Sequence, residues 1–124
     1  MKNILIIDDD KLNLATARRV LSAEYKVIPA MKGTQALAYL QNGDCDIILL
    51  DINMPEMDGY EATRAIRKSD KPDAATVPIY AMTANAFAED VMAAMDAGMN
   101  GHIAKPIEVR ILYETLQEVL KNRR

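Results

Sequence analysis

The sequence has almost no cysteine: Cys45 is the only one among its 124 residues. One cysteine cannot form an intrachain disulfide. Because Cys45 lies beside the apolar run Ile47 to Leu50, we interpret it as a packing residue rather than a reactive thiol.

The sequence also lacks a concentration of positive charge. Its 15 Lys and Arg residues are scattered and are outnumbered by 18 Asp and Glu residues, which gives a net charge of -3. Nucleic-acid-binding domains usually carry a basic stripe or patch. We therefore expect no direct contact with nucleic acid.

Long hydrophobic runs are absent as well. The apolar runs are a few residues long, whereas a helix that spans a bilayer needs about 20 apolar residues. Residues 1–3 lead directly into a strand pattern, without the features of a signal peptide. We expect a soluble, cytoplasmic domain without membrane contact. Because no linker rich in Pro, Gly or Ser divides the chain, we predict one domain over residues 1–124.

The hydrophobic residues that are present gather in short runs typical of strands. Ile4–Ile7, Ile47–Leu50 and Val77–Met82 are apolar at successive positions, as in strands of a parallel sheet covered on both faces. The weaker runs 25–30 and 101–106 contain Lys and Pro, which sheets tolerate best at their edges. We therefore predict three inner strands and two edge strands.

Helical patterns alternate with these strands. They lie near residues 11–23, 33–42, 59–69, 86–97 and 107–121. The last pattern places four apolar residues on one face, Leu112, Leu116, Val119 and Leu120. Five alternations of strand and helix, joined by right-handed crossovers, predict a doubly wound α/β domain.

Three methionines lie in or just after the fourth helical pattern. We interpret Met92, Met95 and Met99 as packing residues of the core and the helix end, although Met-rich surfaces can also adapt to partners.

Three consecutive carboxylates, Asp8, Asp9 and Asp10, follow the first apolar run. At an effective dielectric of about 20, two like charges about 4 Å apart repel by about 4 kcal/mol. The group therefore needs a cationic partner or a solvated setting. Because Asp10 directly precedes the first predicted helix, we interpret it as the N-cap of that helix.

Other polar side chains follow the remaining strand patterns. Asp51 follows the third strand, Thr83 the fourth and Lys105 the fifth. Ligands of open α/β sheets bind outside the carboxyl ends of the strands. Each residue alone is most simply a loop residue, but their joint placement predicts a site at that rim.

Four segments, in this order and spacing, resemble the signature segments of receiver domains from two-component signalling proteins: ILIIDDD, LLDINMPEMDGYEATRAIR, VPIYAMTANA and AGMNGHIAKPI. The resemblance covers the whole chain. It implies a flavodoxin-like (βα)5 fold with a five-stranded parallel sheet in the order 2-1-3-4-5.

The resemblance also implies a metal site and a modified residue. Asp51 would be the phosphorylated residue. Asp8, Asp9 and Asp51 would hold Mg²⁺ together with the backbone carbonyl of Asn53.

Three further residues would act on the phosphoryl group or respond to it. By resemblance, the Thr83 hydroxyl and the Lys105 ammonium bind the phosphoryl group. Thr83 and His102 would then form the switch whose movement follows phosphorylation.

The implied function is a phosphoacceptor switch of a two-component phosphorelay, either a stand-alone regulator or the receiver segment of a hybrid sensor kinase. It would take a phosphoryl group from a sensor histidine kinase or a histidine phosphotransfer domain and change its binding surface for an unknown downstream protein. His102 lies in a strand pattern and not on an exposed helix, so the phosphodonor must lie in another domain or molecule. We expect no enzymatic activity beyond intrinsic autophosphorylation and autodephosphorylation.

The chemistry of this transfer explains the crowded carboxylates. Moving a phosphoryl group onto a carboxylate brings two anions together, and the transition state spreads charge over three equatorial oxygens. Mg²⁺ prefers oxygen ligands and keeps several waters, so a few carboxylates and one carbonyl are a plausible protein contribution.

Two other motifs fit less well. Asp8-x-Asp10 also begins the motif of haloacid-dehalogenase-like phosphatases, but Leu12 stands where that motif has Thr or Val. A Mg²⁺-dependent phosphatase with an aspartyl nucleophile, Asp51 or Asp8, is the alternative function. An EF-hand loop starting at Asp51 is rejected because Pro55 and Glu56 occupy the positions of an oxygen ligand and a glycine.

Overall fold

The computed structural model describes residues 2–52, 59–69, 74, 76–83, 88–104 and 108–121. In this part of the chain, strands and helices alternate from end to end. The strands are β1 (Lys2–Ile7), β2 (Tyr25–Ala30), β3 (Ile47–Asp51), β4 (Ile79–Thr83) and β5 (Gly101–Ala104). The helices are α1 (Lys11–Leu21), α2 (Gly33–Asn42), α3 (Gly59–Arg67), α4 (Ala88–Ala97) and α5 (Val109–Lys121).

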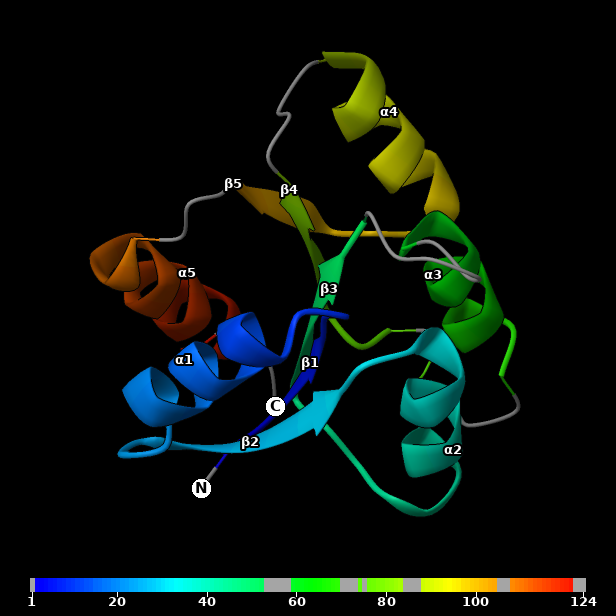
Figure 1. Ribbon diagram of the computed structural model, residues 1–124. Helices are drawn as coiled ribbons and strands as arrows, with labels where there is room; N and C mark the ends of the chain where they lie inside the picture. Colours follow the sequence, from blue (N-terminus) through cyan, green and yellow to red (C-terminus); the bar gives the residue numbers. More distant parts are fainter. Residues whose placement is uncertain are drawn as a thin grey trace.

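The strands form one parallel sheet in the order β2-β1-β3-β4-β5. This confirms the predicted flavodoxin-like order and the predicted edge strands (Figure 1). In the register of the sheet, Ile4 of β1 lies between Val27 of β2 and Ile47 of β3. The carboxyl ends of β1 and β3 are therefore neighbours.

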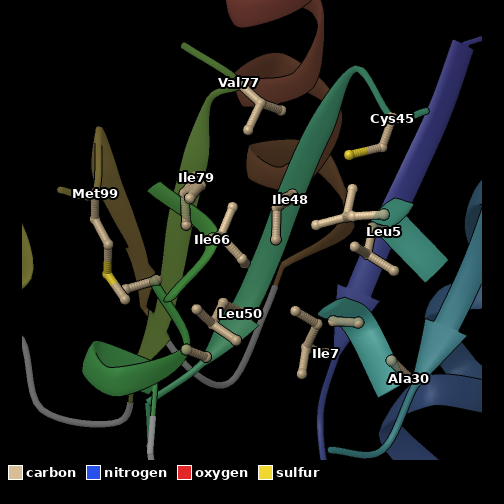
Figure 2. Close-up of a cluster of buried hydrophobic side chains, with 14 of the residues drawn as sticks. Leu5, Ile7, Ala30, Cys45, Ile48, Leu50, Ile66, Val77, Ile79 and Met99 are labelled. Atoms are coloured by element: carbon tan, nitrogen blue, oxygen red, sulfur yellow. The ribbon is translucent and has the colours of Figure 1, made fainter. Parts of the chain in front are cut away.

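Helices cover both faces of the sheet. Helices α1 and α5 lie on one face, and α2, α3 and α4 lie on the other (Figure 1). Figure 2 shows the apolar cluster on the second face, where Leu5, Ile48 and Ile79 from the sheet pack near Ile66 of α3. Cys45 is buried in this cluster, which confirms its interpretation as a packing residue. On the first face, Leu112, Leu116 and Leu120 of α5 are buried, as the helical pattern predicts.

Several elements end at residues other than those predicted. Helices α1 and α3 end at Leu21 and Arg67, each two residues before the predicted end. The strand predicted to begin at Val77 begins at Ile79, because Pro78 has no backbone N–H for the sheet ladder. At their carboxyl ends, β3 and β4 each run one residue beyond the predicted strand, so that they include Asp51 and Thr83.

Helix α4 turns a different side to the sheet from the one predicted. Ala94 and Ala97 are buried, whereas Met92 and Met95 have exposed fractions of 66% and 53%. The packing interpretation is therefore wrong for these two methionines and correct for Met99, which is buried. The small alanines let the helix lie close to the sheet, and the long side chains are left outside.

Arg67, at the end of α3, joins three segments that are distant in sequence. Its Nε and Nη2 atoms both donate to the Gly98 carbonyl, at 2.9 and 2.7 Å. Its Nη1 donates to the carbonyls of Ala74 and Val77, at 3.1 and 2.7 Å, and Nη2 also donates to Asn100 Oδ1 at 2.8 Å. Gly98 has a φ of 110°, a backbone conformation that residues with a side chain rarely adopt. The guanidinium thus fixes the turn between α4 and β5 against the start of β4.

None of the described helices is both long enough and apolar enough to cross a membrane.

Candidate metal centre

Three carboxylates meet at the carboxyl ends of β1 and β3. Asp8 and Asp9 follow β1 directly, and Asp51 is the last residue of β3. One carboxylate oxygen from each of the three lies within 4.8 Å of the others. Asp8 and Asp51 are buried, with exposed fractions of 2% and 5%, whereas Asp9 is exposed. The two buried carboxylates form the floor of the cluster, and Asp9 lies on its solvent side.

The start of α1 holds the Asp8 carboxylate. The backbone N–H of Asp10 donates to Asp8 Oδ1 at 3.0 Å, and the side-chain amide of Asn13 donates to Oδ2 at 3.3 Å. The backbone of Asp8 is also fixed, since its N–H donates to the Ala30 carbonyl at 3.0 Å. Both carboxylate oxygens therefore have donors that come from the first turn of one helix.

The contact of Asn13 with Asp8 is a feature that sequence reasoning missed. Asn13 is the third residue of α1, a position from which side chains commonly fold back over the N-terminus of their helix. A polar residue three places after a predicted N-cap is the signal that could have found it.

Asp10 is the N-cap of α1, as predicted. Its Oδ1 accepts from the backbone N–H groups of Leu12 and Asn13, at 2.9 and 3.4 Å. Because this carboxylate is turned toward its own helix, Asp10 is not part of the cluster of three.

Gly59 brings α3 directly against the backbone that carries Asp51. Its N–H donates to the Ile52 carbonyl at 2.9 Å. A Cβ atom at this position would lie 2.7 Å from Ile52 Cα and 2.8 Å from the Asp51 carbonyl oxygen. Both are backbone atoms, which cannot give way without moving Asp51, so only glycine fits here without distortion.

The other residues implied by the resemblance are placed only in part. Thr83 is buried at the end of β4, the strand next to β3. His102 is exposed on the edge strand β5, paired with Ala81 of β4. Asn53 and Lys105 lie outside the described residues.

A groove of about 280 Å³ opens beside Asp8, between α1 and α5. Its lining is largely apolar and comes mainly from these two helices and from the sheet beneath them. The lining residues are Ile6, Asp8, Leu12, Asn13, Thr16, Ala17, Val20, Leu49, Met82, Val109 and Leu112. Asp8 is the member of the carboxylate cluster that lines this groove.

The electrostatics of the cluster fit a small divalent cation. With oxygens within 4.8 Å, the charges of Asp8 and Asp51 repel by at least about 3 kcal/mol at an effective dielectric of about 20. Hard divalent cations take carboxylate oxygens as ligands, and Mg²⁺ is usually held by a few carboxylates while it keeps several waters. The carboxylates of Asp8, Asp9 and Asp51 supply oxygen ligands of this kind.

The comparisons with known proteins agree with this geometry. A sequence model of the response regulator receiver domain matches residues 4–117. The chain belongs to the response regulator receiver domain family. Receiver domains are signalling switches of two-component systems. Membership of this family therefore does not favour the alternative function of a Mg²⁺-dependent phosphatase.

The relatives of this receiver domain include much longer histidine kinases, each of which it matches over a small part. It is 36% identical over 118 residues to the sensor histidine kinase RcsC of Salmonella typhimurium, covering 91% of this chain and 12% of that protein. It is 37% identical over 124 residues to the hybrid signal transduction histidine kinase L of Dictyostelium discoideum, covering 96% of this chain and 7% of that protein. The chain thus spans about an eighth or less of these two relatives.

Solved structures of similar length match nearly all of this chain. The chemotaxis protein CheY4 of Vibrio cholerae has a TM-score of 0.90 at 32% identity, with 96% of this chain and 98% of that chain covered. The receiver domain of the sensor histidine kinase PA1611 of Pseudomonas aeruginosa has a TM-score of 0.88 at 34% identity, with 98% of each chain covered. That structure has a magnesium ion coordinated in its active site cleft.

Proposed function

We propose that Asp51 accepts a phosphoryl group from the phosphohistidine of a sensor kinase or of a histidine phosphotransfer domain. The observation that carries the proposal is the cluster of three carboxylates, with oxygens within 4.8 Å of one another at the ends of β1 and β3. This is an arrangement that needs a cation, and it lies where open α/β sheets bind their ligands. The similarity to receiver segments of histidine kinases supports a histidine donor.

In the proposed reaction an Asp51 oxygen forms a bond to phosphorus while the bond between phosphorus and the donor imidazole nitrogen breaks. The donor imidazole, which carries a proton on its other ring nitrogen, leaves as a neutral histidine, and the product is an acyl phosphate on Asp51. Asp8, Asp9, Asp51 and the Asn53 carbonyl would hold Mg²⁺, which would supply positive charge to offset the repulsion between the two anions. Asp51 is suited to the nucleophilic role because it is buried at a strand end, where the backbone orients it.

The remaining residues act on the phosphoryl oxygens. The Thr83 hydroxyl donates a hydrogen bond to one of them, and the Lys105 ammonium pairs with another. Inward movement of Thr83 then changes the position of His102, which alters the surface of α4, β5 and α5 for a downstream protein. Support for the Thr83 role comes from its buried place on the strand beside β3.

The domain works in the cytoplasm, as the receiver segment of a hybrid sensor kinase or as a separate regulator. The similarity to a hybrid kinase supports the first arrangement, and the similarity to CheY4 over nearly its full length supports the second.

Mass spectrometry after incubation with acetyl phosphate and Mg²⁺ tests the proposal. We expect one added phosphoryl group that hydroxylamine removes, and no addition in Asp51→Asn. Asp10→Asn is the matched control, because asparagine caps helices as well as aspartate and should leave the modification intact. Modification that persists in Asp51→Asn would assign the nucleophile to another residue. Continuous release of phosphate without accumulation of the modified chain would favour the phosphatase alternative.

A further inference from the structure

The geometry points to Asn13 as a positioning residue that holds the Asp8 carboxylate in the orientation required by Mg²⁺ and thereby favours Mg²⁺ over Ca²⁺. This inference rests on the proposed function, since it concerns the same metal site. Asn13 does not belong to the set of metal-binding carboxylates. In this inference it acts on the metal only through its hydrogen bond to Asp8.

The first step is the identity of the contacting atom. Asn13 Nδ2 lies 3.3 Å from Asp8 Oδ2. An ionised carboxylate only accepts hydrogen bonds, so the amide nitrogen of Asn13, and not its oxygen, must face Asp8. The amide therefore donates to the charged form of Asp8, the form that binds a cation.

The second step is the restraint on rotation. Asp8 Oδ1 accepts from the Asp10 backbone N–H at 3.0 Å, so the two oxygens are held by donors on separate atoms of the same helix start. Rotation of the carboxylate about its Cβ–Cγ bond would break both hydrogen bonds. With Asn13 removed, rotation about this bond would break only the Asp10 hydrogen bond of this pair, so the carboxylate would be held less firmly in its present orientation.

The third step is what each cation requires. Mg²⁺ demands nearly octahedral geometry with oxygens at about 2.0 to 2.1 Å, whereas Ca²⁺ accepts 2.3 to 2.6 Å and either one or both oxygens of a carboxylate. A fixed carboxylate therefore helps Mg²⁺ more than Ca²⁺. Residues that orient metal ligands through hydrogen bonds typically change metal affinity by about 10- to 100-fold when they are replaced.

The Asn13 side chain is exposed, so its replacement leaves the core intact. Its backbone N–H, which Asp10 caps, is present whatever the side chain. Leucine is a better helix former than asparagine. Asn13→Leu is therefore expected to fold, and its effect can be assigned to the lost amide.

Isothermal titration with Mg²⁺ and, separately, with Ca²⁺ tests the inference on wild type, Asn13→Leu and Asn13→Ala. Both variants should bind Mg²⁺ about tenfold more weakly, at the lower end of the usual range because Asn13 is exposed. Their affinity for Ca²⁺ should change by about threefold or less. Urea unfolding of the metal-free proteins should show that both variants are folded. Thr16→Val is the matched control, since Thr16 lines the same groove one turn further along α1, and it should leave both affinities unchanged.

Unchanged Mg²⁺ affinity in both Asn13 variants would overturn the inference while leaving the proposed function in place. An equal loss for Mg²⁺ and Ca²⁺ would also overturn it, because a positioning role predicts unequal losses. If the wild-type protein bound no Mg²⁺, both the inference and the proposed metal site would fail.

Discussion

At the residue scale, Asp8 and Asp51 are two carboxylates that the fold buries side by side. The hydrogen bonds from Asp10 and Asn13 stabilise the charged form of the Asp8 carboxylate, but neither adds a positive charge that would offset the repulsion between the two carboxylates. A bound cation would relieve it, so occupancy of the site and stability of the fold should be linked.

Mg²⁺ should raise the free energy of unfolding of the wild-type domain. At ten times the dissociation constant we expect a gain of about 1.4 kcal/mol, because the metal binds the folded chain and not the unfolded one. Asp9→Asn removes a cluster carboxylate at its solvent side and should remove most of this gain. Urea unfolding with and without Mg²⁺ measures both effects. An unchanged Mg²⁺ response in Asp9→Asn would remove Asp9 from the ligand set.

Tyr25 should make the domain less stable at alkaline pH. Burial, reinforced by the negative charge of Glu24 and by Tyr113, raises the pKa of the Tyr25 phenol above its usual value of about 10. Because the folded chain holds this proton more tightly, the contribution is complete below about pH 10 and is lost as the pH rises through the folded pKa.

Replacement of Tyr25 by phenylalanine tests this directly. In Tyr25→Phe the free energy of unfolding should fall less steeply than in wild type from about pH 9 to pH 11, because the titrating group is gone. Urea titrations at a series of pH values measure the slope. Parallel curves for the two proteins would mean that Tyr25 is not responsible for the alkaline loss.

At the element scale, the start of α3 is the contact that places a helix directly on the backbone of the site. Gly59 makes this close approach possible, and the Thr63 hydroxyl donates to the Gly59 carbonyl at 2.8 Å within the buried first turn. The position of α3 and the position of Asp51 are therefore coupled.

Gly59→Ala should destabilise the fold by about 2 kcal/mol, because the added Cβ meets backbone atoms of Ile52 and Asp51. Gly43→Ala is the matched control. A Cβ there would lie 2.7 Å from Cζ of the Tyr39 ring, a side-chain atom that can move, so the expected loss is smaller. Urea unfolding compares the two variants. Equal losses would mean that the contact of α3 with the Asp51 backbone is not especially tight.

Local patterns predicted the elements well, because apolar runs and helical periodicity report burial along one segment. The α5 face and the Asp10 cap are of this kind. The side of α4 that packs on the sheet was mispredicted, since its apolar residues do not gather on one face and periodicity cannot choose among them. The contacts of Arg67 depend on Gly98, 31 residues away, which no local pattern encodes.

At the scale of the whole molecule, the site and the proposed output surface lie on neighbouring parts of one sheet. Thr83 ends β4, and β4 pairs with β5, on which His102 is exposed. A change at Asp51 therefore has a short path to β5 through the strand between them. We treat the two forms of the surface as pre-existing states whose populations shift by the differential stabilisation that phosphorylation gives each.

Thr83→Ala should still accept a phosphoryl group on Asp51 but should lose the response of β5 and α5. The reason is that the hydroxyl, and not the strand itself, is drawn toward the new phosphoryl oxygens. Amide chemical shifts over residues 88–104 and 108–121, recorded with and without beryllofluoride and Mg²⁺, measure the response. Equal shift changes in wild type and Thr83→Ala would exclude coupling through Thr83.

The pairing of β1 with β3 also has a consequence for folding kinetics. The backbone N–H of Asn3 donates to the Asp46 side chain at 2.7 Å across a sequence separation of 43, so the two strands meet only after a long loop has closed. Before closure, Asp8 and Asp51 are far apart and hardly repel each other. Their repulsion destabilises the native state. If β1 and β3 pair after the folding transition state, this repulsion should speed unfolding more than it slows folding, and so shorten the lifetime of the folded domain.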